Sequence, residues 1–303
     1  VYEYASCACL GCSGHAMSEY ISDKEVKELE TKANEIRQSL IAMLVEAGSG
    51  HTAGPLGMAD VFTALYFHIL NHKPGEPEWK DRDRLILSNG HITPIRYATM
   101  AHAGYFPTSE LATLRKFGSR LQGHPEREKL PGLETTSGPL GSGLGQAVGM
   151  ALAARMDGLK WQTICLMSDG ELQEGVVWES AMFAGKHRLA SLTALIDRNN
   201  IQIDGLTEDV MPLEPLRAKW ESFGWHVLEI DGHNMEAIVG AFAQARAIVE
   251  KPVMIIAHTI AGKGVPEIEF DYKWHGVAPK PQEAQRFLAQ LRTLSGCISG
   301  EHQ

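Results

Sequence analysis

Asp169 and Asn199 are the two residues whose spacing first suggests chemistry. Asp169 directly follows the apolar run TICLMS (163–168), and Asn199 stands thirty residues further on, just after the run LTALID (192–197). Two neighbouring parallel strands would bring the Asp169 carboxylate and the Asn199 amide oxygen to the same edge of a sheet. Such oxygen ligands, with a backbone carbonyl, suit Mg²⁺ or Ca²⁺ and leave positions for phosphate oxygens. The spacing therefore predicts a metal-assisted phosphate site.

The residues around Asp169 fit this interpretation but also allow a simpler one. Gly170 permits close approach of the backbone to a phosphate, and a helix expected to begin near Gly175 would offer its amino end. Asp-Gly and Asn-Asn are also ordinary turn residues and helix caps, so a purely structural turn is the alternative. Of the other acids in MSDGELQEGVVWE (167–179), we expect Glu171 and Glu179 to be solvated helix residues, as surface acids usually are.

A glycine-rich segment, GLETTSGPLGSGLGQAVGMALA (132–153), is open to two interpretations. A dinucleotide or nucleoside-triphosphate loop would need GxGxxG or GxxxxGK[ST], and neither pattern is present. Gly141, Gly145 and Gly149 recur every four residues instead, which predicts one bare face of a helix for close packing.

Strands and helices alternate along the chain. Five apolar runs predict strands, at 84–88, 163–168, 192–197, 226–231 and 253–258. Helical patterns are expected near 22–47, 58–70, 109–118, 142–156, 175–188, 212–223 and 235–249, with one more amphipathic helix after 282. This alternation predicts an α/β fold, a parallel sheet with helices on both faces that binds ligands at the carboxyl ends of its strands.

Composition and charge exclude several classes of function. The 303 residues contain 28 basic and 37 acidic side chains, a net charge of −9, and 44% of the residues are hydrophobic. This balance is typical of a globular protein with a sizeable core and argues against a nucleic acid or an anionic membrane as partner. No apolar stretch approaches the roughly eighteen residues that span a bilayer.

The cysteines point to a reducing compartment. Cys7, Cys9 and Cys12, with His15, could form a metal knot, but zinc sites usually need a second ligand pair, so we favour an unstructured extension. Residues 1–16 are expected to be a leader or a misassigned start before Met17. Because the remaining cysteines are far apart, no disulfide framework is expected, and a cytoplasmic location is predicted.

The motifs together resemble one family. A Gly-Asp-Gly sequence followed about thirty residues later by Asn is the thiamine diphosphate motif, and the segment 168–205 is similar to the transketolase family. Further matches occur in order along the chain: SGHTAGPLGMAD (49–60), DRLILSNGH (83–91), GHPE (123–126), GLETTSGPLGSGLGQAVGMALA (132–153) and WHGVAP (274–279). The resemblance is closest to the separately encoded amino-terminal subunit, with residues 17–282 as its thiamine diphosphate-binding domain and 283–303 as a terminal helix and tail.

The resemblance implies a cofactor site. Asp169, Asn199 and the carbonyl of Ile201 would hold Mg²⁺, for which Ca²⁺ or Mn²⁺ can substitute. The residues implied to contact thiamine diphosphate are His91, Gly138, Pro139, Leu140, Asp169, Gly170, Glu174, Asn199 and His275. Glu174 also matches an interface glutamate that lies close to the catalytic acid of the partner.

Four histidines match those around the reacting carbon, namely His51, His91, His124 and His275. The resemblance implies that His124 reaches the first hydroxyl of the donor, while His51 and His275 lie beside the thiazolium and the substrate oxygen. Histidine suits this work because it titrates near neutral pH, where sugar hydroxyls must be oriented and deprotonated. The alternative for each is an ordinary surface or core histidine.

The chain departs from the family pattern in three places and in length. Ser168 replaces the first glycine of the cofactor motif, and Thr52-Ala53 and Ile92-Thr93-Pro94 differ on the substrate side. No domain after residue 282 would bind the aminopyrimidine or supply the activating glutamate. The resemblance therefore implies a separate carboxy-terminal, pyrimidine-binding subunit, an α2β2 assembly, and ketol transfer from a ketose phosphate to an aldose phosphate.

Two alternatives remain for the function. One is another thiamine diphosphate enzyme component, such as a 1-deoxyxylulose 5-phosphate synthase, which the sugar-handling segments WHGVAP and GHPE disfavour. The other is a non-catalytic relative that retains the fold, although a decayed site would not need to keep Asp169, Asn199 and all four histidines.

Overall fold

A central five-stranded parallel sheet organises the chain. The computed structural model describes residues 21–293, so the predictions for residues 1–16 and their cysteines lie outside the described part. The strands are β1 (Arg84–Leu87), β2 (Thr163–Ser168), β3 (Leu192–Arg198), β6 (His226–Asp231) and β7 (Val253–His258). They lie in the order β1-β2-β3-β7-β6, and all neighbours are parallel. The predicted α/β fold is confirmed, and β2, β6 and β7 begin and end at the predicted residues.

Helices follow most of these strands. The α-helices are α1 (Asp23–Ala47), α2 (Ala53–Gly57), α3 (Ala59–Ala64), α4 (Thr93–His102), α5 (Ser142–Met156), α6 (Gly175–Lys186), α7 (Thr207–Val210), α8 (Leu216–Ser222), α9 (Met235–Ala247) and α10 (Pro281–Thr293). Shorter elements are the π-helix η1 (Leu65–Ile69), the 3-10 helices η2 (Gly90–Ile92), η3 (Thr108–Thr113), η4 (Gly170–Gln173) and η5 (Tyr272–Trp274), and a small hairpin of β4 (Ile201–Gln202) and β5 (Gly205–Leu206). Within residues 21–293, none of the helices has the length and apolar character that crossing a bilayer requires.

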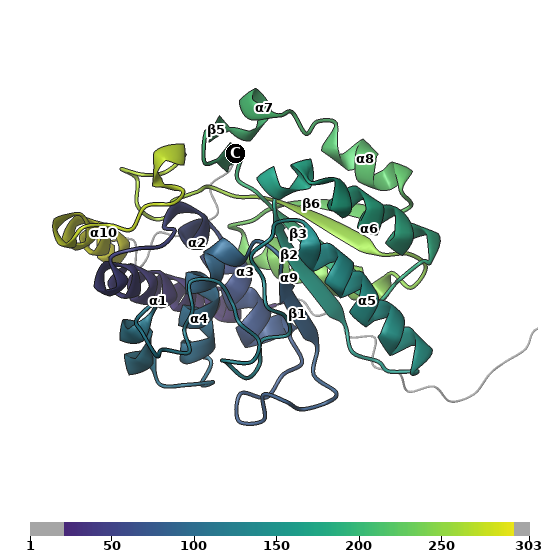
Figure 1. Cartoon of the computed structure of the whole chain (residues 1–303), viewed down its shortest axis with the longest axis horizontal. Coiled ribbons are helices and arrows are strands. Elements are labelled where there is room, and N and C mark those ends of the chain that lie inside the picture. Colours follow the sequence, from purple (N-terminus) through teal and green to yellow (C-terminus); the bar gives the residue numbers. More distant parts are fainter. Residues whose placement is uncertain (1–20, 294–303) are drawn as a thin grey trace, which may run out of the picture.

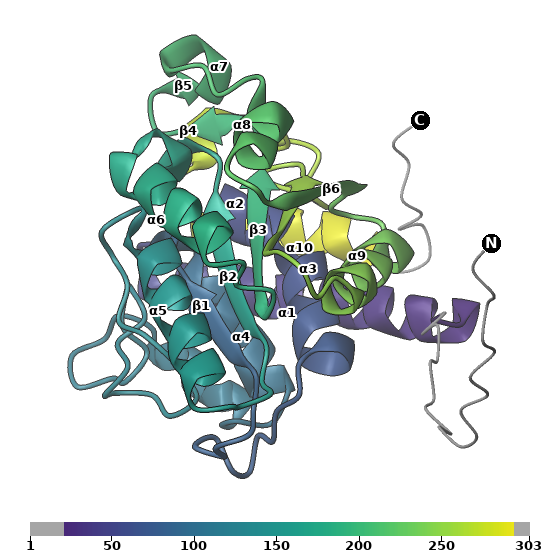
Figure 2. The same ribbon diagram turned by 90° about the vertical axis from the view of Figure 1, so that its right-hand side faces the viewer.

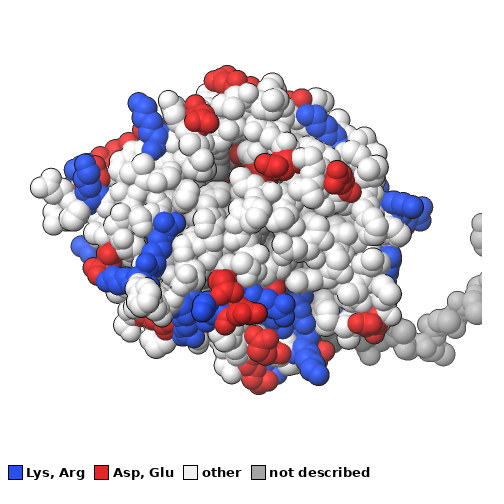
Figure 3. Space-filling model, viewed as in Figure 1, with Lys and Arg blue, Asp and Glu red and all other residues white. Residues whose placement is uncertain are grey.

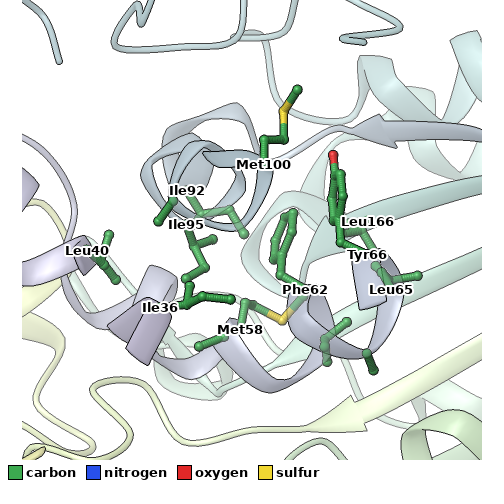
Figure 4. Packing of buried hydrophobic residues seen from close by; sticks show 14 of the residues in the cluster. Ile36, Leu40, Met58, Phe62, Leu65, Tyr66, Ile92, Ile95, Met100 and Leu166 are labelled. Atoms are coloured by element: carbon green, nitrogen blue, oxygen red, sulfur yellow. The ribbon is translucent and has the colours of Figure 1, made fainter. Parts of the chain in front are cut away.

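Two helical layers cover the sheet (Figures 1 and 2). Ile164 and Leu166 of β2 pack into the cluster that contains α1, α3, α4 and α9, whereas Cys165 and Met167 pack with α5, α6 and α8. Successive side chains of a strand point to opposite faces, so a sheet buried on both faces needs strands that are apolar throughout. Figure 4 shows part of the first cluster, where side chains of α1, α3 and α4 meet. At the edge of the sheet, β6 is only partly buried.

Helix α1 ends where the first loop of the site begins. Ser22 caps it through a capping box with Glu25, as predicted, and Gly48 ends it in the left-handed conformation, with φ of 63°. Inside the core, Arg37 of α1 donates two hydrogen bonds, of 2.9 and 2.6 Å, to Asp60 of α3. This buried ion pair fixes α1 to α3, and the loop between α1 and α2 carries His51.

Three local predictions differ from the structure. The expected helix at 109–118 is only the 3-10 helix η3, and the one at 212–223 begins at Leu216. The bare glycine face of α5 is only partly used: a Cβ on Gly145 would lie 3.2 Å from Ser180 of α6, but a Cβ on Gly149 would meet nothing within 4 Å. The tightest glycine of α5 is Gly143, where a Cβ would lie 2.3 Å from the Ser88 Cβ.

Candidate active site

Three of the four predicted histidines form a cluster. His51 lies before α2, His91 lies in η2 after β1, and His275 follows η5, so three distant segments meet here. The ring centroids are 4.9 Å apart for His51 and His91, 5.3 Å for His51 and His275, and 5.1 Å for His91 and His275. The fold therefore gathers imidazoles that are up to 224 residues apart in the sequence.

Burial keeps these imidazoles neutral. It lowers the pKa of His51 to about 4, with smaller contributions from the charges of His275, Arg115 and His124. Burial also holds the pKa of His91 well below its usual range and lowers the pKa of His275. A neutral imidazole offers one donor and one acceptor, and the buried Nδ1 of His51 has no partner among the described residues. The cluster can therefore accept or orient a substrate hydroxyl.

His124 lies beside this cluster at the surface. A Cβ on Gly90 would be 3.2 Å from the His124 Cδ2, so its ring packs against the backbone directly before His91. Its side chain is exposed, and its pKa is lowered first by partial burial and then by the nearby charge of Arg115. An exposed, neutral imidazole at the rim is suited to meet a substrate that enters from solvent.

Asp169 and Asn199 lie at the carboxyl ends of the neighbouring strands β2 and β3, as their spacing predicts. Strands β2 and β3 pair in parallel with Ser168 opposite Asp197. Asp169 is the next residue after Ser168, and Asn199 comes two residues after Asp197. The Asp169 carboxylate is fully buried and accepts 2.7 Å hydrogen bonds from the Gly170 and Asn200 N–H groups. Burial raises its pKa, although these donors and Arg198 favour the charged form.

Asn199 is oriented by a second buried acid. Its Nδ2 donates to Asp197 Oδ2 at 2.9 Å, and its Oδ1 accepts from the Ile201 N–H at 3.0 Å. The Asp197 carboxylate also accepts from the Thr259 hydroxyl, and burial raises its pKa to about 7. Sequence reasoning did not single out Asp197; its place inside an otherwise apolar strand, LTALID, was the available signal.

The oxygen donors fit Mg²⁺, with one competing group. The carboxylate of Asp169, the amide oxygen of Asn199 and the carbonyl of Ile201 are of the kind that Mg²⁺ prefers, and all three residues are buried. Asp169 follows the end of β2, and Asn199 and Ile201 follow the end of the neighbouring strand β3. Arg198 Nη1 donates to Asp169 Oδ2 at 3.0 Å, while its Nη2 bonds Glu208 and Glu214. Across residues 21–293, no three His, Cys, Asp or Glu side chains gather as a metal site, so the amide and carbonyl oxygens are essential to this assignment.

The Gly138–Leu140 loop leads into the amino end of α5. Pro139 and Leu140 are exposed and Gly138 is half-buried, which leaves this backbone accessible to a ligand. Gly141 caps α5 in the left-handed conformation, with φ of 82°, and a Cβ there would lie 2.9 Å from Glu174 and Val176 side-chain atoms. Only glycine fits this conformation without strain.

The three acids that follow Asp169 differ in how deeply they are buried. The prediction that Glu171 is solvated is wrong: it is 1% exposed, because β1 and the amino end of α5 pack over it. Burial raises its pKa. Glu174, the residue directly before α6, and Glu179 are exposed, which agrees with the prediction for Glu179 and leaves Glu174 accessible. Figure 3 shows that charged side chains lie mainly at the rim of this face, which is hollowed near its centre.

Comparison with known proteins decides the family. Residues 29–293 match the family described as "Transketolase, thiamine diphosphate binding domain". The chain belongs to the transketolase family. It is 46% identical over 271 residues to a 6-deoxy-6-sulfo-D-fructose transketolase subunit of Clostridium sp. (strain MSTE9), covering 89% of this chain and 98% of that protein. It is 40% identical over 267 residues to one subunit of the apulose-4-phosphate transketolase of Phocaeicola vulgatus, covering 88% of this chain and 95% of that protein.

Solved transketolases share the fold but are longer. The transketolase of Campylobacter jejuni superposes with a TM-score of 0.82 at 34% identity, covering 91% of this chain and 43% of that enzyme. The chain thus spans less than half of the solved enzymes but nearly all of the two subunit relatives. The predicted family is confirmed, as is the correspondence to the amino-terminal subunit of a split transketolase with a thiamine diphosphate-binding domain.

Proposed function

We propose that this subunit transfers a two-carbon ketol unit from a ketose phosphate to an aldose phosphate, and that it does so only with a separate pyrimidine-binding subunit. The observation that carries the proposal is the convergence of three neutral histidines with accessible backbone at the carboxyl ends of the strands. The two subunit relatives act, by their names, on a sulfonated ketose and on a phosphorylated sugar. An anionic sugar is accordingly the substrate class we propose here.

The residues of the chain divide the work between binding and proton handling. Asp169, Asn199 and the Ile201 carbonyl would hold Mg²⁺, and Gly170 with the Gly138–Leu140 loop would contact the diphosphate. Thiamine diphosphate, when bound, supplies the carbon nucleophile that accepts the ketol unit, and the protein orients it and handles protons. Neutral His51 and His275 would accept hydrogen bonds from substrate hydroxyls, and His124 would meet the donor at the rim.

Reconstitution tests the function. The purified chain is incubated with thiamine diphosphate, Mg²⁺, a ketose phosphate and an aldose phosphate, with and without the pyrimidine-binding subunit, and both sugar products are quantified. Ketol transfer is expected only in the complete mixture, and an α2β2 mass is expected by light scattering. Rapid turnover by the chain alone would refute the split arrangement, and cofactor binding without any transfer would favour the non-catalytic alternative.

Calorimetry with Asp169→Ala tests the metal assignment. In the reconstituted assembly this substitution removes the carboxylate that we assign to Mg²⁺, so Mg²⁺-dependent binding of thiamine diphosphate should be abolished. Asp204→Ala, in the turn between β4 and β5, is the matched control and should bind as the wild type does. Unchanged affinity of Asp169→Ala would refute the assignment.

A further inference from the structure

The Glu171 carboxylate joins three segments that are far apart in the sequence. Its Oε1 accepts from the Ser88 hydroxyl at the end of β1 and from the Gly141 N–H at 2.8 Å. Its Oε2 accepts from the Ser168 N–H at 2.9 Å and from the Ser168 hydroxyl at 3.4 Å. Within the described residues, no basic side chain forms an ion pair with Glu171, so neutral donors alone satisfy this buried carboxylate.

Ser88 extends this network to the first turn of α5. Its hydroxyl donates to Glu171 and accepts from the Gly143 N–H at 3.0 Å. The contact is close, because a Cβ on Gly143 would lie 2.5 Å from this same Ser88 Oγ. The Ser88 N–H in turn donates to the Leu166 carbonyl of β2 at 2.9 Å, which ties the end of β1 to the sheet. Glu171 and Ser88 therefore hold the amino end of α5 through two backbone amides.

The bonded amides lie on either side of the proposed cofactor contacts. Gly141 directly follows the Gly138–Leu140 loop, while Ser168 directly precedes Asp169. A buried carboxylate is strongly constrained in position, because the loss of a donor leaves one of its oxygens buried without a hydrogen bond. A displacement of Gly141 relative to Ser168 would lengthen or break one of these hydrogen bonds, so the carboxylate restrains the distance between the two halves of the site.

We propose that Glu171 is a positioning residue, which sets the Gly138–Gly141 loop against the Asp169 strand end and thereby determines the affinity for the diphosphate of the cofactor. It acts through the backbone of these segments and contacts neither cofactor nor substrate. The proposal rests on the proposed function for the identity of the ligand, but the anchoring of the loop can be measured without any ligand.

The first experiment measures anchoring in the unliganded chain. Glu171→Gln keeps the size of the side chain but replaces one acceptor oxygen with an NH₂ donor that faces a backbone or hydroxyl donor. Amide hydrogen exchange at Gly141 and Gly143 should accelerate at least roughly tenfold, the loss expected for one hydrogen bond to a charged group. Glu236→Gln, an exposed acid in the first turn of α9, is the matched control and should exchange at these amides as the wild type does.

The second experiment measures the consequence in the reconstituted assembly. At saturating Mg²⁺, the Kd for thiamine diphosphate should rise roughly tenfold in Glu171→Gln, while kcat at saturating cofactor stays within about twofold of the wild type. Ser88→Ala removes the hydroxyl that links Glu171 to Gly143 and should also raise the Kd. Because both substitutions disrupt one network, the double variant should lose less affinity than the sum of the single losses.

The outcomes separate the proposal from its alternatives. A lower melting temperature with unchanged Kd would make Glu171 purely structural, and a loss of kcat with unchanged Kd would place it in the chemistry; either result overturns the proposal. If Glu171→Gln does not fold, Ser88→Ala decides the same question. If the wild-type assembly does not bind thiamine diphosphate, the proposed function fails, whereas unchanged exchange at Gly141 and Gly143 in Glu171→Gln refutes the anchoring itself.

Discussion

At the scale of single residues, the site depends on ionisable side chains whose pKa values burial shifts from their usual range. The histidine cluster is kept neutral, and Asp169 is paired with Arg198 through one oxygen while its other oxygen accepts from Gly170. The neutral histidines can orient hydroxyls without adding a positive charge beside the cofactor. Because Asp169 already pairs with the Arg198 guanidinium, a metal ion would compete with that guanidinium for the carboxylate. Each effect has a measurable consequence.

The first consequence is a pH dependence of stability. The folded-state pKa of His51 is about 4 against an ordinary value of 6.5, so between these values the unfolded chain binds a proton that the folded chain does not. The contribution of His51 to the free energy of unfolding is therefore fully present above about pH 6.5 and is lost as the pH falls through about 4. Melting temperatures at about pH 7 and about pH 5 should differ less in His51→Gln than in the wild type. An equal difference in the two proteins would contradict the prediction.

The second consequence concerns Arg198. Its guanidinium bonds Asp169 and would repel a cation there, so Arg198→Ala should lower the Mg²⁺ concentration needed for cofactor binding, roughly tenfold. Calorimetric titration of Mg²⁺ at fixed thiamine diphosphate measures this shift. Arg217→Ala, which removes an exposed arginine paired with Glu221 and Glu229, is the control. Weaker Mg²⁺ binding in Arg198→Ala would show that Arg198 supports the metal site instead.

At the scale of elements, the glycines of helix α5 differ in how closely the neighbouring segments approach them. Gly143 must lack a side chain because the end of β1 lies against it, whereas Gly149 on the same helix faces open space. The equal spacing of Gly141, Gly145 and Gly149 suggested one packing face, but the closest approach on α5 is at Gly143, a glycine outside that series. Spacing shows which residues share a face, and only the neighbouring strand decides which of them needs to be glycine.

A pair of substitutions on α5 tests this difference. Gly143→Ala should lower the free energy of unfolding by about 1–3 kcal/mol, because the new Cβ would lie 2.3 Å from Ser88. Gly149→Ala should raise it by about 0.5–1 kcal/mol, since alanine favours a helix interior and meets nothing here. Urea denaturation of both variants measures the two changes, and destabilisation by Gly149→Ala comparable to that of Gly143→Ala would contradict the structure.

At the scale of the whole molecule, an uncovered apolar surface adjoins the site. Val176, Met182 and Phe183 of α6 are 39%, 55% and 40% exposed, and Leu140, just before the amino end of α5, is 38% exposed. In Figure 3 few charged side chains lie over α5 and α6. Exposed apolar side chains that gather on neighbouring elements usually mark a surface that a partner covers. With Glu174 exposed directly before α6, this surface is where we expect the second subunit.

Phe183→Asp tests this expectation. The substitution should prevent assembly with the pyrimidine-binding subunit while it changes the melting temperature of the isolated chain by no more than a few degrees, because Phe183 is already partly exposed. Val249→Asp places the same charge at another exposed apolar residue, after α9, and should assemble normally. Size-exclusion chromatography with light scattering distinguishes the two, and normal assembly of Phe183→Asp would exclude α6 from the interface.

The sequence by itself determined most of the elements and the end of the sheet at which Asp169 and Asn199 lie. Apolar runs and helical periodicity depend on local residue order, so β2, β6, β7 and the cap of α1 followed directly from it. The tertiary structure alone decided the burial of Glu171, which bonds Ser88 from 83 positions away. It also decided that Asp197 orients Asn199 and that Arg198 pairs with Asp169. These facts depend on which distant segments pack against a side chain, and packing sets both the solvation and the partners of every charged group.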